Sequence, residues 1–471
     1  MNVVRVSKHD SRVESPARIQ RKRVKLQTIA CGALLACATL LASSSPAMAQ
    51  AGKLDSSFGV GGIFTDIANG FFSTGPFTNT QTFATAVAVQ SNGKIVAGGQ
   101  IGGNSAVIRL NSNGTLDSTF GHGGTVGPIL GGNVGQCQVI GLGIQGDGKI
   151  VVGITNINQG FGPMFIVARL NANGSFDTTF GSGGITETQL GQSEAAASVF
   201  ALQSDEKVLL AGFGFMTRYD VTGQLDSTFG SSGVAKVLVR NPSAIALQSD
   251  GKILLAAGGS VVGSALENPG LSLNQAAGVL ARYDANGTLD TSFGIAGQVA
   301  TLPVAAAIAV QNNSGCTNTC HILVGGAVAS LNINGGNGFG FGVVRYSSNG
   351  SIDETFGEAG EATTAFSPDA TPFALAIQSN GDILAAGSAG QVAFPAQADF
   401  ALARYASSGA PDSTFGSAGK ITTAFGTNQA AIYALAVQSD GKILAVGGSL
   451  SSSPNPGGIP GGLIVARYLA K

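Results

Sequence analysis

The sequence repeats one phrase, Leu-Asp-x-x-Phe-Gly, and this repetition restricts the chain to folds that are built from copies of one unit. Seven copies are present, and Phe176, Ile352 and Pro411 replace the leucine in three of them. The aspartates of the phrase are Asp55, Asp117, Asp177, Asp226, Asp290, Asp353 and Asp412. They lie 49 to 64 residues apart. Repeats of that length predict propeller blades or turns of a solenoid.

An arginine stands eight residues before each of the last six aspartates, and a seventh arginine stands close to the C-terminus. These arginines are Arg109, Arg169, Arg218, Arg282, Arg345, Arg404 and Arg467. Asp55 has no arginine before it and Arg467 has no aspartate after it, so the chain resembles a ring cut within one pair. We expect each arginine to face its aspartate across a hairpin, or the aspartate to cap the turn, and Asp55 to meet Arg467. Repetition in every unit favours a structural role for these pairs over a ligand site.

A second phrase lies between successive copies of the first. It is an apolar strand ending in glutamine, a tight turn and another apolar strand, as in residues 85–90, Ser91-Asn92-Gly93 and residues 94–99. The turn recurs around Gly148, Gly251, Gly381 and Gly441, around Glu206 without the glycine, and in expanded form after Gln311. Asn-Gly or Asp-Gly between apolar runs indicates a β-hairpin, because glycine accepts the positive φ of a tight turn. A third strand ends at the arginine, and we expect a fourth to run through Asp-x-x-Phe-Gly.

These patterns predict an all-β fold, a seven-bladed β-propeller of four-stranded antiparallel blades. A solenoid needs distinct capping ends, and this chain has none. It has instead a single fourth strand at its start, in residues 54–65, and three strands without a fourth at its end. We expect the N-terminal strand to pair with the C-terminal blade, which closes the ring and removes exposed sheet edges. Residues 50–471 then form one domain.

The combined motif resembles a known family. Arg-Tyr-x-x-x-Gly-x-Leu-Asp-x-x-Phe-Gly, as in residues 282–294, and Gln-x-Asp-Gly-Lys-Ile-Leu, as in residues 248–254, are similar to the delta-60 repeat of bacterial exported proteins. The resemblance covers residues 54 to 468, and the strand order is more loosely similar to that of NHL-type propellers. It implies a β-propeller-like repeat and brings no activity or site residues with it.

The first 49 residues differ from the rest of the chain. Eight basic residues precede an apolar run from Leu26 to Ala42, and Ala47-Met48-Ala49 offers small residues for cleavage, which indicates an export signal of residues 1–49. There are two weaker alternatives. One is a lipid anchor on Cys37, because Leu34-Leu35-Ala36-Cys37 resembles a lipobox. The other is an uncleaved membrane anchor, for which the apolar run is at the short end of the length needed to span a membrane. No later segment is a transmembrane candidate. We therefore expect an exported protein that is periplasmic, secreted or on the outer surface.

Composition and charge exclude some partners. Glycine is 71 of 471 residues, and only 11% of the residues are charged. Removal of residues 1–49 takes away eight basic and two acidic residues, which leaves 17 basic and 24 acidic residues and a net charge of −7. A mildly acidic chain with no basic stripe argues against nucleic acid as a partner. We expect a monomer, and a partner that is a protein or polysaccharide of the cell envelope.

The aromatic and sulfur-containing residues have mostly structural interpretations. The phenylalanines of the phrase are expected as core residues between blades, and the alternative is a platform for stacking sugars. They are Phe58, Phe120, Phe180, Phe229, Phe293, Phe356 and Phe415. Cys316 and Cys320 lie in the expanded turn and could close a small disulfide in an exported protein. Cys137 is expected to be a buried small side chain. No fourth ligand accompanies Cys316, Cys320 and His321, so we expect no metal and no cofactor.

The sequence supports two hypotheses of function. The loops of variable length gather on one face, and the tight turns lie on the other. The long loops are 68–82, 258–276, 326–340, 387–399 and 448–461, and Phe71, Phe72 and Phe77 are the aromatic candidates for binding among them. The first hypothesis is a non-enzymatic binding or surface-interaction scaffold that uses this face, because no catalytic constellation is recognisable. The second is a carbohydrate hydrolase or lyase that acts at the central mouth.

Overall fold

Every regular element in the described part of the chain is a β-strand. The computed structural model describes residues 50–65, 82–130, 137–156, 164–191, 196–258, 278–301, 304–311, 320–333, 336–390, 398–425, 429–450 and 462–471. Among them, no helix is long and apolar enough to span a membrane. The signal segment with Cys37, the loop residues Phe71, Phe72 and Phe77, and Cys316 lie outside the described residues, so the predictions about them stay predictions.

Five sheets have four antiparallel strands each, in the order in which the strands follow one another along the chain. The first contains β2 (Phe83–Val89), β3 (Ile95–Ile101), β4 (Asn104–Leu110) and β5 (Thr125–Val126). The second contains β6 (Cys137–Ile144), β7 (Ile150–Asn156), β8 (Met164–Leu170) and β9 (Ile185–Thr188). The third contains β10 (Val199–Leu202), β11 (Val208–Gly212), β12 (Phe215–Tyr219) and β13 (Val234–Lys236). The fourth contains β14 (Ala244–Leu247), β15 (Ile253–Gly258), β16 (Gly278–Tyr283) and β17 (Gln298–Thr301). The fifth contains β18 (Val304–Gln311), β19 (His321–Ile333), β20 (Gly336–Tyr346) and β21 (Glu361–Thr364).

The remaining eight strands form one larger sheet from two antiparallel halves. One half contains β22 (Ala370–Ile377), β23 (Ile383–Gly390), β24 (Ala398–Tyr405) and β25 (Lys420–Thr423). The other contains β26 (Gln429–Val437), β27 (Ile443–Leu450), β28 (Gly462–Tyr468) and β1 (Ile63–Thr65). A single parallel pair, Ala398 with Gln429, joins the halves. Within the second half, the N-terminal strand β1 pairs with β28 from the C-terminal end of the chain, as expected.

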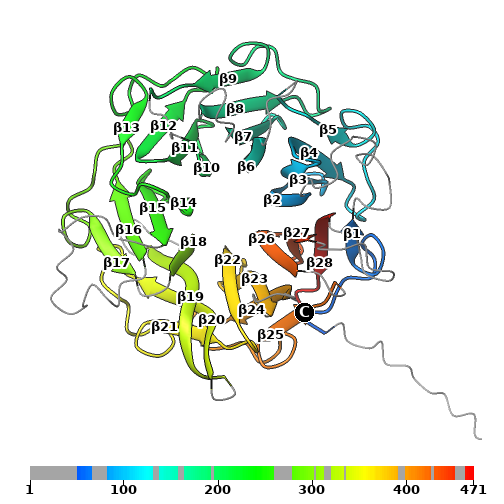
Figure 1. The fold of residues 1–471 in the computed structure, drawn as a ribbon, viewed down its shortest axis with the longest axis vertical. Coiled ribbons are helices and arrows are strands. Elements are labelled where there is room, and N and C mark those ends of the chain that lie inside the picture. Colours follow the sequence, from blue (N-terminus) through cyan, green and yellow to red (C-terminus); the bar gives the residue numbers. More distant parts are fainter. Residues whose placement is uncertain are drawn as a thin grey trace, which may run out of the picture. The chain divides into compact units, whose positions relative to one another are not determined.

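The first strand of each four-stranded group lies nearest the central opening (Figure 1). The second and third strands are the most buried, because a sheet lies against each of their faces; every residue of β7 is buried, for example. The hydrophobic clusters of the described residues each combine side chains from two neighbouring groups. The cluster around Phe58 and Phe64 joins β26–β28 and β1 to β2–β4, so the last group packs against the first.

Glycines in the second strand let neighbouring groups approach closely. A Cβ atom on Gly98 of β3 would lie 2.9 Å from a methyl group of Val139, which belongs to β6 of the next sheet. A Cβ atom on Gly448 of β27 would lie 2.5 Å from the Cβ of Phe83 in β2. Side chains do not approach this closely, so the Gly-Gly pair of these two strands serves the packing between sheets.

The repeated phrase itself forms a turn, which corrects the expectation of a strand running through it. In the first copy the Phe58 N–H donates to the Asp55 carbonyl and the Gly62 N–H donates to the Phe58 carbonyl. The fourth strand, β1, begins only at Ile63. The same holds for β5, which begins at Thr125, whereas its phrase ends at Gly121. Asp and Gly favour turns over strands, and this local preference prevails here.

Candidate functional site

Each arginine of the repeated pairs lies against its aspartate, as expected. The Arg Nε atom donates to Oδ2 of the aspartate over 2.7 to 2.9 Å in all seven pairs. The side chains of these residues are between 4% and 18% exposed. At this degree of burial, removal of one partner leaves a desolvated charge, so each pair constrains the structure far more than an exposed pair would.

The aspartate also caps its own turn, so both roles expected for it occur together. Oδ1 of Asp55 accepts from the backbone N–H of Ser57 over 3.0 Å and from its hydroxyl over 2.6 Å. Burial by itself raises the pKa of Asp55. The hydrogen bonds from Ser57 and the positive charge of Arg467 outweigh burial and bring that pKa to about 2. The carboxylate is therefore ionised throughout the neutral range.

A second cation reaches most of these aspartates from the tight turn between the first two strands. Lys94 lies 2.7 Å from Oδ2 of Asp117, and Lys149, Lys207, Lys252 and Lys442 occupy equivalent positions against their aspartates. His321 takes this place beside Asp353, at 3.1 Å. Asp382 stands at the same position of the repeat in the β22–β25 group. Sequence reasoning missed this contact, although the lysine after the turn glycine was a visible signal.

The phenylalanine of the phrase stacks against the arginine. The guanidinium carbon lies 4.5 to 4.7 Å from the ring centroid in all seven copies. The rings are at most 1% exposed, which confirms the core role and removes the alternative of a sugar-stacking platform, because a buried face cannot meet a ligand. A guanidinium over an aromatic face makes a cation–π interaction, which is strongest when both groups are shielded from water.

The arginine also binds the neighbouring group of strands, which sequence reasoning did not anticipate. Nη1 donates to a backbone carbonyl two residues beyond the end of the third strand of the next group. The acceptors for Arg109, Arg169, Arg218, Arg282, Arg345, Arg404 and Arg467 are Ala172, Val221, Ala285, Ser348, Ser407, Ala470 and Ser112. The glycine of the phrase adds a second bond, as from the Gly59 N–H to the Asn113 carbonyl over 2.8 Å. Arg, Asp, Phe and Gly thus form a joint between groups.

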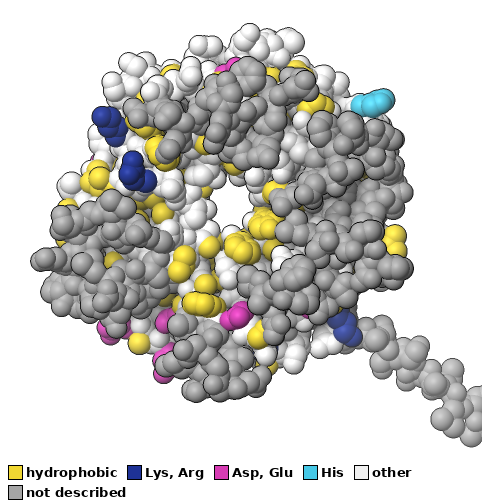
Figure 2. Space-filling model, viewed as in Figure 1, with side chains coloured by type: hydrophobic (Ala, Val, Ile, Leu, Met, Phe, Trp, Pro, Cys, Tyr) yellow, Lys and Arg dark blue, Asp and Glu magenta, His cyan; other side chains and the backbone are white. Residues whose placement is uncertain are grey.

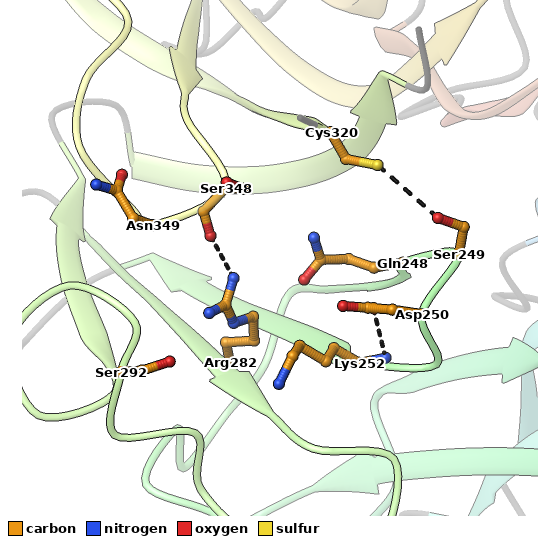
Figure 3. Close-up of a pocket in the computed structure, with 9 residues that line it drawn as sticks. All are labelled: Gln248, Ser249, Asp250, Lys252, Arg282, Ser292, Cys320, Ser348 and Asn349. Carbon is orange, nitrogen blue, oxygen red and sulfur yellow. Dashed lines mark hydrogen bonds between the residues drawn. The ribbon is translucent and has the colours of Figure 1, made fainter. Parts of the chain in front are cut away.

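Polar cavities open beside two of these joints, on the face that carries the tight turns. The smaller cavity, of about 220 Å³, lies between the β14–β17 and β18–β21 sheets. Figure 3 shows the side chain of Gln248 pointing into the space between Arg282 of its own sheet and Cys320 of the next. The Cys320 sulfur lies 3.8 Å from the Ser249 hydroxyl. Lys252 and Arg282 also line this space, but both are paired with Asp290.

The larger cavity, of about 860 Å³, lies between the β26–β1 half-sheet and the β2–β5 sheet. It is lined by Ser57, Val89, Gln90, Ser91, Gly93, Ser112, Asn113, Val437, Gln438, Ser439, Asp440, Lys442 and Arg467. Its volume falls within the range of about 300–1,000 Å³ that is typical of small-molecule sites. We call it the junction cavity.

A cluster of aromatic rings lies at the central opening. Phe83 of β2, Tyr433 of β26 and Phe373 of β22 come from the innermost strands of three neighbouring groups. The ring centroids of Phe83 and Tyr433 are 5.7 Å apart, and those of Phe373 and Tyr433 are 5.6 Å apart. All three side chains are half-buried. Figure 2 shows hydrophobic side chains gathered along one side of the opening. We call these three residues the aromatic wall.

The sulfur and imidazole groups do not assemble into a metal centre in the part of the chain that the structure describes, where no three His, Cys, Asp or Glu side chains could hold an ion. Cys137 is buried on β6, as expected, and burial raises the pKa of its thiol. Cys320 is buried beside the smaller cavity. Its disulfide with Cys316 stays a prediction because Cys316 is not described.

Five segments of the chain match one family model, and each contains the stretch from the arginine of the third strand to the phenylalanine of the phrase. The model is described as a domain of unknown function (DUF5122) beta-propeller. The matched residues are 90–120, 145–180, 270–293, 321–356 and 378–415, about a third of the chain. The match to the DUF5122 model and the four-stranded antiparallel groups both indicate blades of the propeller type. The name delta-60 repeat is not tested by this match and stays a prediction.

No curated protein matches the chain. Among solved structures, a streptogramin B lyase is similar with a TM-score of 0.42 and 14% identity, covering 78% of this chain and 91% of that one. An extracellular domain assigned to a one component system of B. thetaiotaomicron has a TM-score of 0.39 and 14% identity. That likeness covers 82% of this chain but 38% of that one, so this chain spans less than half of its length. Likenesses at this level carry no argument about activity.

Proposed function

We propose that this chain is an exported, non-enzymatic seven-bladed β-propeller that serves as a binding scaffold through the end of its axis that carries the variable loops. The partner is a protein or polysaccharide of the cell envelope. The observation that carries the proposal is the aromatic wall, because half-buried rings on three adjacent innermost strands offer an anchor that a partner can cover.

The joints support seven blades and a closed ring. Each of the seven arginines donates to the group that follows it, and Arg467 donates to Ser112 of the β2–β5 sheet. The eight-stranded sheet then corresponds to two blades, since among the described residues a single parallel pair is the strand pairing between its halves. In that arrangement β1 is the outer strand of the seventh blade.

The arrangement of polar groups favours a scaffold over an enzyme. The aspartates of the phrase are committed to buried ion pairs and turn caps, and they recur in every group. Burial raises the pKa of Glu361 and of Asp399, which are the kind of carboxylates that an acid catalyst would need. They lie on β21 and β24, away from the innermost strands, so they do not form a pair at the axis.

Export is supported by the N-terminal segment, whose basic start, apolar run and small-residue cleavage site are typical of a signal. We expect the mature chain to begin near Gln50. The lipid-anchored form through Cys37 is the alternative, and mass spectrometry of the mature N-terminus separates the two forms, since only the second carries acyl chains.

The test compares binding of envelope extract by the mature protein and by Tyr433→Ser. Loss of one specific partner in Tyr433→Ser is expected. The control is Val221→Ser, which changes an apolar side chain that is 44% exposed and lies in the tight turn after β12, on the opposite face from the variable loops. Retention of every partner by folded Tyr433→Ser would refute the proposal. Turnover of an envelope polysaccharide by the purified protein would favour the hydrolase or lyase instead.

A further inference from the structure

We propose that the junction cavity binds a small neutral polyhydroxy compound of about the size of a mono- to trisaccharide. The cavity lies at the tight-turn face, so this site is separate from the scaffold face proposed above and does not depend on it.

The chemistry of the wall points to a neutral ligand with many hydroxyl groups. Seven of the 13 lining residues carry neutral hydroxyl or amide side chains: Ser57, Gln90, Ser91, Ser112, Asn113, Gln438 and Ser439. Val89 and Val437 add apolar surface from the innermost strands. A sugar ring presents hydroxyl groups at its rim and C–H groups on its faces, so it matches both kinds of surface.

The two glutamines supply acceptors that their own surroundings leave unused. Oε1 of Gln90 and Oε1 of Gln438 are buried and make no hydrogen bond within the described residues. Both residues line the cavity. The last torsion of a glutamine side chain is soft, so each amide can turn its oxygen toward the cavity. A buried acceptor without a donor is unfavourable, and a ligand hydroxyl that donates to it removes that cost.

The charges of the site disfavour an ion as the ligand. Lys442 lies 3.2 Å from Asp55 and 3.2 Å from Asp440, and Arg467 lies 2.9 Å from Asp55. Two cations thus face two carboxylates, and neither sign is left over to attract an anion or a cation. Because the positive charges are already neutralised, phosphate has to compete with the carboxylates for them.

The experiment is a saturation-transfer NMR titration of the mature protein with glycerol, D-glucose and maltotriose. Inorganic phosphate and choline serve as charged comparison probes. Binding of at least one neutral probe is expected, with no competition from phosphate or choline. The double variant Gln90→Leu/Gln438→Leu should weaken that binding about tenfold or more, because leucine keeps the volume and removes both acceptors.

Two controls distinguish a loss of ligand binding at the cavity from a loss of the folded state. The double variant should unfold at the same or a higher temperature than the parent, since it removes unsatisfied buried oxygens and leaves the ion pairs in place. Gln203→Leu changes the equivalent glutamine of the β10–β13 sheet, which does not line the cavity and whose Oε1 is likewise buried without a hydrogen bond within the described residues, and should leave polyol binding unchanged. The proposal is overturned by any of three results. The first is that none of the three polyols binds. The second is that phosphate or choline competes with the bound polyol. The third is that the folded double variant binds the polyol as strongly as the parent.

Discussion

The Nε atom of Arg467 lies 2.9 Å from Oδ2 of Asp55, although 412 residues separate the two along the chain. Lys442 joins the same carboxylate at 3.2 Å, and the guanidinium stacks on Phe58. The contact has the geometry of the six pairs that lie eight residues apart in sequence. The two ends of the folded chain are therefore held by the same chemistry that joins its interior groups.

Replacement of one member of this pair should destabilise the fold strongly. Asp55→Asn leaves the buried Arg467 without its counter-charge, and we expect a loss of about 3–5 kcal/mol in the free energy of unfolding. Denaturant unfolding of the mature protein measures this loss. The double variant Asp55→Asn/Arg467→Met should lose less than Asp55→Asn alone, because no unpaired charge stays buried. Wild-type stability of Asp55→Asn would contradict the structural role.

Acid should unfold the protein as these aspartates take up protons. The pKa of Asp55 and that of Asp177 are about 2 in the folded chain, against about 3.9 in an unfolded one. The unfolded chain therefore binds protons first as the pH falls, so the stabilisation is complete above about pH 4 and is lost between about pH 4 and about pH 2. The melting temperature across this range measures the effect. A melting temperature that stays constant down to pH 2 would show that the pairs contribute nothing.

The glycine of the phrase should tolerate no side chain. Gly121 has φ of 54°, and a Cβ atom there would lie 2.2 Å from the Thr125 carbonyl oxygen, so Gly121→Ala meets both backbone strain and a clash. Gly183 has φ of 64° with nothing within 4 Å, so Gly183→Ala meets strain alone. We expect about 1–2 kcal/mol of destabilisation for Gly183→Ala and more for Gly121→Ala, measured by thermal unfolding. Equal losses would mean that the clash is relieved elsewhere.

The position of the second cation offers a stabilising change. Asp382 occupies the place that Lys94 has in the first sheet, and Asp412 is the most exposed aspartate of the seven, at 18%. Asp382→Lys should add a partner to Asp412 and raise the free energy of unfolding by up to about 1 kcal/mol. Lys94→Asp is the reverse change and should lower it, because Asp117 then faces a like charge. Destabilisation by Asp382→Lys would show that a lysine at this position does not reach Asp412 in the way that Lys94 reaches Asp117.

The unpaired ends of the repeat predicted the contact between Asp55 and Arg467, and the spacing of eight residues predicted each hairpin pair. Local chemistry suffices for the hairpin pairs, because the Asp N–H and the Arg carbonyl meet wherever the turn forms, as for Asp117 and Arg109. The aromatic wall could not be predicted in the same way. Phe373 and Tyr433 both stand five residues before the glutamine of their strand, but Phe83 stands seven residues before Gln90. The sequence instead drew attention to Phe71, Phe72 and Phe77.

The sequence by itself determined the first three strands of each group, their order and the arginine that pairs with each of the last six aspartates, because these depend on residues within one repeat. The tertiary structure alone decided what lies between the repeats. The bond from Arg467 to Ser112, the closeness of Gly448 to Phe83 and the cavity beside Gln90 and Gln438 all join residues of different repeats. No periodicity encodes those contacts, because they arise only when one sheet packs against the next.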